Sequence, residues 1–139
     1  MRRRLFALTV CILLIGCIGT IECLAAVTPP EIEPQYDLTL STRAGLTISD
    51  TGVASCSGTI RANATTSKVN ITLRLYKKSG SSWLIIKSWS KTDQPFKGSI
   101  SETYNVGAGT YKVIVSGKIT ATDGQTEYVS VSTGEKVYK

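Results

Sequence analysis

The sequence predicts an all-β domain, an antiparallel β-sandwich of about seven strands, preceded by a signal peptide. Apolar residues alternate with Ser, Thr and Lys along residues 36–139, as expected for strands with one dry and one wet face. Turn-forming residues recur between the alternating segments, and no stretch of a dozen residues has helical periodicity. Because each sheet then has one apolar face to bury, we expect two sheets packed against each other.

Four strands are predicted in the first half of the domain. They lie at residues 36–48, 53–62, 69–76 and 83–89, and they are separated by a turn at 50–52, a polar loop at 63–67 and a turn at 77–82. The third has the clearest alternation, with a dry face formed by Val69, Ile71, Leu73 and Leu75. The run Trp83-Leu84-Ile85-Ile86 does not alternate, so the fourth strand either contains a bulge or is buried on both sides.

Three further strands complete the domain, at residues 100–106, 111–119 and 128–131, with 137–138 as a candidate extension of the last. Asp93-Gln94-Pro95 is expected to end the strand before them, because proline cannot donate to a sheet. Asp123-Gly124 is a strong hairpin dipeptide.

The segment Gly109-Thr110-Tyr111-Lys112-Val113 matches the Gly-x-Tyr-x-apolar entry to the penultimate strand of many immunoglobulin-like sandwiches. In those domains the tyrosine hydroxyl bonds to nearby backbone. By analogy, Val113 takes the place of the second immunoglobulin cysteine, and Cys56 lies near the first. The predicted fold is therefore an antiparallel immunoglobulin-like β-sandwich.

The leader predicts export. Arg2, Arg3 and Arg4 precede an apolar run over residues 5–15, and small residues at Cys23 and Ala25 fit cleavage after Ala25. We therefore expect a signal peptide at 1–25, a Pro-rich linker at 26–35, a sandwich domain at 36–139 and a secreted product without a transmembrane segment. Leu14-Ile15-Gly16-Cys17 resembles a bacterial lipobox, so the alternative is a protein anchored to the cell surface by a lipid on Cys17.

Charge and cysteine content restrict the function further. Removal of Arg2, Arg3, Arg4 and Glu22 with the leader lowers the net charge from +6 to +4. The remaining lysines are dispersed, whereas nucleic-acid-binding proteins cluster their basic residues, so no nucleic-acid partner is expected. Cleavage after Ala25 leaves Cys56 as the one mature cysteine, and we expect it to be a small buried core residue.

The residues required by common catalytic sites are missing. The chain has no histidine, which excludes Ser-His-Asp and Cys-His catalysis and histidine-containing zinc sites. Most carboxylates of the mature chain lie in the linker or at predicted turns, where they bond locally or are solvated. The sequence therefore predicts a non-enzymatic domain with no cofactor and no metal site.

The aromatic residues Tyr76, Trp83 and Trp89 are the candidate ligand-binding residues. An exposed aromatic row on a sandwich could stack on sugar rings, whereas tryptophans buried in the core would supply the volume that a small sandwich needs. The six-residue spacing of the tryptophans places both on one face of a regular strand, unless a bulge intervenes.

Five segments in order carry a family resemblance: Cys56-Ser57-Gly58, residues 75–83, Lys87-Ser88-Trp89-Ser90, residues 101–106 and Gly109-Thr110-Tyr111-Lys112-Val113. They resemble an uncharacterised family of small secreted proteins, a domain of unknown function, from Gram-positive, clostridia-like gut bacteria. The resemblance implies export and a β-sandwich, and it carries over no catalytic residue. The chain departs from the family at Leu84-Ile85-Ile86, which is more apolar than the stretch expected between the tryptophans.

Three functions remain open from the sequence. The preferred one is a secreted, monomeric, cell-surface or extracellular interaction module, whose partner is a cell-wall polymer, a glycan or a surface protein. The second is a carbohydrate-binding module that uses Trp83 and Trp89 together with Tyr76. The third is a secreted bacteriocin-like effector.

Overall fold

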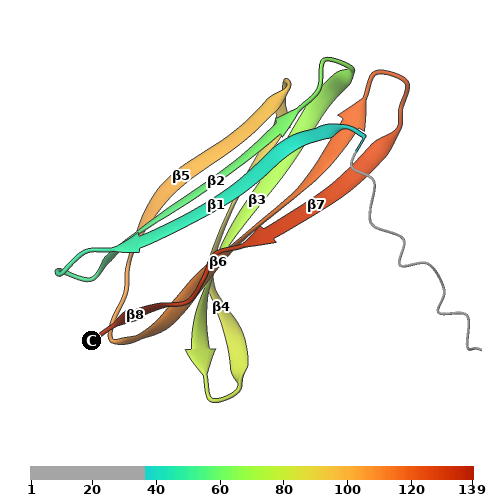
Figure 1. Cartoon of the computed structure of the whole chain (residues 1–139). Coiled ribbons are helices and arrows are strands. Elements are labelled where there is room, and N and C mark those ends of the chain that lie inside the picture. Colours follow the sequence, from blue (N-terminus) through green and yellow to red (C-terminus); the bar gives the residue numbers. More distant parts are fainter. Residues whose placement is uncertain (1–36) are drawn as a thin grey trace, which may run out of the picture. The chain divides into compact units, whose positions relative to one another are not determined.

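Eight strands form two antiparallel sheets in the described part of the chain (Figure 1). The computed structural model describes residues 37–139, so the predicted signal peptide, the linker at 26–35 and Cys17 lie outside the described residues. Among those residues there is no helix long and apolar enough to cross a membrane. The strands are β1 (Thr39–Ile48), β2 (Val53–Ala62), β3 (Thr66–Ser79), β4 (Ser82–Gln94), β5 (Lys97–Asn105), β6 (Gly109–Ala121), β7 (Thr126–Ser132) and β8 (Lys136–Tyr138).

The prediction of an all-β, antiparallel architecture is confirmed. Sheet A has the order β1-β2-β5, and sheet B has the order β4-β3-β6-β7. Residues 137–138 belong to the separate strand β8, not to an extension of β7. β8 pairs with Gly109–Tyr111 at the start of β6, whereas β7 pairs with Ile114–Thr120 farther along the same strand.

The core lies between the two sheets, where the alternating apolar residues meet. The predicted dry face of β3 is buried at Val69, Ile71, Leu73 and Leu75. From β2, Gly58 lies so close to sheet B that an added Cβ would be 2.6 Å from a methyl carbon of Val115. The two sheets therefore form a sandwich-like pair of layers.

Tyr111 is the largest fully buried side chain. Its hydroxyl donates a hydrogen bond to the Gly107 carbonyl oxygen at 2.6 Å, just before β6 begins. This bond confirms the expectation that the hydroxyl bonds to nearby backbone. A buried phenol needs such an acceptor, because an unpaired hydroxyl in the core would be destabilising.

The β3–β4 hairpin is longer and its turn is tighter than predicted. Residues 77–79 do not form a turn but continue the ladder, with Lys77 opposite Leu84 and Lys78 opposite Trp83. The chain reverses at Gly80, which has a φ of 61° in the left-handed region that favours glycine. The polar composition of 77–82 predicts a loop, but pairing with β4 keeps residues 77–79 extended.

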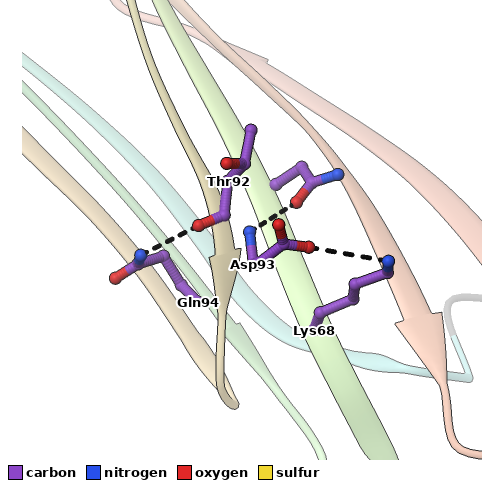
Figure 2. A network of polar contacts seen from close by, with 5 residues as sticks. Lys68, Thr92, Asp93 and Gln94 are labelled. Carbon is purple, nitrogen blue, oxygen red and sulfur yellow. Dashed lines mark hydrogen bonds and ion pairs between the residues drawn. The ribbon is translucent and has the colours of Figure 1, made fainter.

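The break predicted at Asp93-Gln94-Pro95 is displaced, because β4 runs on to Gln94 and β5 begins as early as Lys97. Figure 2 shows the polar contacts at this corner. The Asn70 side-chain oxygen accepts a bond from the Asp93 amide at 2.8 Å, and the Asp93 carboxylate lies 3.5 Å from the Lys68 ammonium. Asp93 has a φ of 53°, in the left-handed region that non-glycine residues rarely adopt, and these contacts stabilise it there.

Candidate functional site

A bulge in β4 separates the two tryptophans. Leu75 is opposite Lys87, but the next residue, Tyr76, is opposite Ile85, so Ile86 is the extra residue. The extra residue changes the alternation of β4 between its two ends. The residues on the Trp83 side of the bulge therefore face the opposite side of the sheet from the one that regular alternation, counted from Trp89, would give them. Trp89 is opposite buried Leu73 and packs against the core, whereas Trp83 is on the outer face of sheet B, on the same side as Tyr76.

On this outer face four side chains form a group that we name the aromatic–lysine cluster: Tyr76 and Lys78 of β3, Trp83 of β4 and Lys112 of β6. The Lys112 ammonium lies 4.3 Å from the centroid of the Trp83 ring and 5.9 Å from that of Tyr76. The Lys78 ammonium lies 5.6 Å from the Trp83 ring centroid. Each of these cation–π contacts is worth about 0.5–1 kcal/mol at an exposed site, so together they favour this arrangement of the two aromatic side chains.

The segment that joins β7 to β8 contributes an acidic group to the edge of the cluster. The Glu135 carboxylate lies 3.3 Å from the Lys78 ammonium. Lys112 has no ion pair with any described residue, so its charge is available to an acidic or hydroxyl-bearing ligand. The pair between Lys78 and Glu135 is exposed and contributes little stability, so a ligand could replace it at small cost.

Near the tip of the β3–β4 hairpin, β4 exposes one apolar side chain on each face. Ile85 is 55% exposed beside Tyr76, and Leu84 is 56% exposed on the opposite face. The non-alternating run of the sequence is therefore neither a core strand nor a strand buried on both sides. It is a bulged segment at the edge of sheet B, with apolar side chains in solvent.

A second aromatic–lysine pair lies farther along the same outer face. The Lys118 ammonium is 5.7 Å from the ring centroid of Tyr128, which is 68% exposed. These residues border a shallow hollow of about 510 Å³ whose floor includes Thr72, Ser116 and Ser130. The sequence showed the polar alternation of β6, but it could not show that β6 lies beside β3, so Lys112, Lys118 and Tyr128 were missed.

Four carboxylates of the described residues, those of Asp93, Asp123, Glu127 and Glu135, bond to neighbouring groups. Glu127 accepts hydrogen bonds from the Leu38 amide at 2.9 Å and from the Thr39 hydroxyl. Asp123 accepts a bond from the Gln125 amide in the β6–β7 turn, at 2.9 Å. Within residues 37–139, no group of three or more His, Cys, Asp or Glu side chains is placed to hold a metal ion.

Cys56 lies in the core on β2 and is 1% exposed. Burial disfavours the thiolate and raises the pKa of the thiol to about 11. A neutral, shielded thiol is a poor nucleophile. The expectation that Cys56 is a small core residue is therefore confirmed.

No protein-family model matches the chain, and no curated protein sequence matches it. The function therefore has to be inferred from the surfaces that the strands present.

Proposed function

We propose that the chain is an exported, non-enzymatic, immunoglobulin-like interaction module that binds glycans through the outer face of sheet B. The observation that carries this proposal is the aromatic–lysine cluster. Tyr76 and Trp83 lie on the outer face, not between the sheets, and the Lys112 ammonium lies 5.9 Å and 4.3 Å from their respective ring centroids.

The immunoglobulin-like assignment is supported by strand order and by one hydrogen bond. The first, second and fifth strands share one sheet, and the third and sixth strands are neighbours in the other. Immunoglobulin-like sandwiches divide their strands in this way. The bond from Tyr111 to Gly107, at the entry to the penultimate long strand, matches the tyrosine corner of that class.

Export is supported by the leader sequence. The order of basic residues, apolar run and small residues before Ala26 is typical of a secretory signal peptide. The resemblance to small secreted proteins of Gram-positive bacteria agrees with this order. We propose cleavage after Ala25, and a lipid on Cys17 is the alternative maturation.

The chemistry of the outer face suits a sugar ligand. Aromatic rings offer flat apolar surfaces with which the C–H groups of a sugar ring can make contact, and at Trp83 a sugar would take the place of the Lys112 or Lys78 ammonium that lies over the ring. The ammonium groups of Lys78 and Lys112 can bond to sugar hydroxyl or carboxylate oxygens at the ring margins. The hollow beside Tyr128 continues this surface along the sheet with threonine and serine hydroxyls, so a chain of several sugars could contact both ends.

The non-enzymatic assignment is supported by the acidic residues. Asp93, Asp123, Glu127 and Glu135 each bond to a neighbouring group that belongs to a turn, a strand end or the hairpin. A glycosidase would instead need two carboxylates facing each other across a substrate cleft.

Depletion from solution by insoluble polysaccharides tests the proposal. The purified protein is incubated with cell-wall peptidoglycan, cellulose, chitin and xylan, and the unbound fraction is measured. We expect saturable binding to at least one polymer, with at least a tenfold loss of affinity in Trp83→Ala and a smaller loss in Tyr76→Ala.

Tyr104→Ala is the matched control. Tyr104 belongs to β5 of sheet A and is 36% exposed, so the substitution removes an accessible aromatic ring away from the cluster. It should leave the affinity unchanged within twofold. An equal loss in Trp83→Ala and Tyr104→Ala, or no binding to any polymer, would contradict the proposal.

A further inference from the structure

The outer face of sheet A differs from that of sheet B. Its outward positions are identified by register, because they alternate with the buried residues of β1, β2 and β5. They hold mainly Ser and Thr, and no carboxylate is among them. Their three cations, Arg43, Arg61 and Lys97, gather at one end.

The register brings these cations together from three strands. Arg61 lies on the central strand β2, directly opposite Lys97 of β5 and opposite Ser41 of β1. Arg43 of β1 is opposite Thr59, which is the outward residue of β2 next to Arg61. Arg43 is therefore a diagonal neighbour of Arg61. Like charges directly opposite each other are destabilising, so this arrangement weakens the sheet when no anion is bound.

The same side chains line a hollow. Ser41, Arg43, Thr59, Arg61 and Lys97 surround a depression of about 370 Å³. Within the described part of the chain, the ion pairs are Lys68–Asp93 and Lys78–Glu135, so none of these three cations has a carboxylate partner there.

Protection of sheet edges by charged residues does not account for this group. Such protection places lysine on edge strands, and Lys97 and Arg43 would fit it. Arg61 does not, because β2 is paired on both sides.

We propose that this hollow, the sheet A cation site, binds a tetrahedral oxyanion, namely a phosphate or sulfate group. Two guanidinium groups can each present a pair of N–H donors to such an anion, and the Lys97 ammonium adds a third charge. The hydroxyls of Ser41 and Thr59 supply uncharged donors to the remaining oxygens. The site is independent of the proposed glycan face, since it lies on the opposite sheet and shares no residue with it.

Titration of the purified protein with sodium phosphate at low ionic strength, followed by amide NMR spectra, tests the site. We expect saturable shifts concentrated at Ser41, Thr59, Arg61 and Lys97. Arg61→Gln and Lys97→Gln should each weaken binding at least fivefold. Arg61→Lys keeps the charge but loses the planar fork, so its affinity should fall between those of the wild type and Arg61→Gln.

Arg74→Gln is the matched control, because it removes the same charge from the outer face of sheet B. It should leave phosphate affinity unchanged within twofold, and thermal unfolding of each variant confirms that it is folded. Shifts spread over the whole surface, an equal loss in Arg74→Gln, or no saturable binding would overturn the proposal.

Two further titrations distinguish the source of the anion. Linear polyphosphate and dextran sulfate carry repeated oxyanions, whereas inorganic phosphate and sulfate carry one each. Binding of a polymer at least tenfold tighter per anion, at the same residues, assigns the site to a phosphorylated or sulfated polymer. Equal affinity per anion assigns it to the free ion. Arg61→Gln should lose this anion binding but keep the glycan binding that depends on Trp83. That result would show that the two surfaces bind their ligands independently.

Discussion

At the scale of single residues, the environment of a side chain decides its role more than its type does. Trp83 and Trp89 lie on one strand, six positions apart, yet one is in the aromatic–lysine cluster and the other packs against the core. Cys56 is the one cysteine in the described residues, and its burial removes the reactivity that an exposed thiol would have.

The two tryptophans should differ in their effect on stability. Trp89→Ala should lower the free energy of unfolding by about 1–3 kcal/mol, because it removes a half-buried ring that packs against the core beside Leu73. Trp83→Ala should lower it by less than about 1 kcal/mol, because it removes surface contacts with Lys78 and Lys112. Urea unfolding of both variants measures the difference, and equal losses would contradict the separation by the bulge.

Cys56 should make stability depend on alkaline pH. The folded thiol keeps its proton up to a pKa of about 11, whereas the unfolded thiol loses it near the ordinary value of 9.0. Between these values the folded state binds more protons, so its stability is complete below pH 9.0 and falls as pH rises towards 11. The loss is on the order of 2 kcal/mol.

Urea unfolding at about pH 8 and about pH 10.5 measures this loss. Cys56→Ala is the reference protein, because titration of lysines and tyrosines affects both proteins alike. The wild type should lose more stability than Cys56→Ala over this interval. Parallel pH dependence of the two proteins would contradict a buried, protonated thiol.

At the scale of strands, the alternation of apolar residues predicted the elements, but pairing decided their lengths. The strands expected at residues 69–76 and 111–119 are present, because each has a dry face of alternating apolar residues, interrupted only at Gly117 of β6. Residues 77–79 were assigned to a turn, because Lys-Lys-Ser is a polar sequence with little strand preference. They stay extended because β4 pairs with them, and that partnership cannot be read from β3 alone.

The close approach of the sheets at β2 should make Gly58 intolerant of a side chain. An added Cβ would lie 2.6 Å from a Val115 methyl and 3.0 Å from a Leu73 methyl, both of which belong to the opposite sheet. Gly58→Ala should therefore cost about 1–3 kcal/mol of unfolding free energy, through overpacking.

Gly134→Ala is the control for this prediction, because an added Cβ at Gly134 meets no atom within 4 Å. It should change stability by less than about 0.5 kcal/mol. Urea midpoints of the two variants make the comparison, and a neutral Gly58→Ala would show that the sheets are farther apart than described.

At the scale of the whole molecule, the sequence predicted the class of fold but only part of the candidate site. Tyr76 and Trp83 were identified from their type and spacing, and Tyr111 was correctly expected to bond to nearby backbone. The sequence alone could not show that Lys112 lies beside Trp83, because the two become neighbours only when β4, β3 and β6 lie side by side in the sheet. Likewise, the bulge at Ile86 arises from strand pairing, and it determines which tryptophan is presented.

The mature protein should begin at Ala26. Cleavage there removes the leader together with Cys11, Cys17 and Cys23, and leaves Cys56 as the one thiol. N-terminal sequencing and the intact mass of the exported protein test this prediction. A lipid-modified N-terminus at Cys17 would instead establish attachment to the cell surface.

The central claim is that Trp83 belongs to a ligand-binding face, whereas Trp89 packs against the core. Fluorescence of two single-tryptophan variants, titrated with the polysaccharide that the purified protein binds, tests it most directly. In Trp89→Phe, which retains Trp83, we predict a saturable emission shift and ready quenching by acrylamide without ligand. In Trp83→Phe, which retains Trp89, we predict blue-shifted emission that no ligand changes. A ligand response confined to Trp89, or no response of Trp83, would contradict the account.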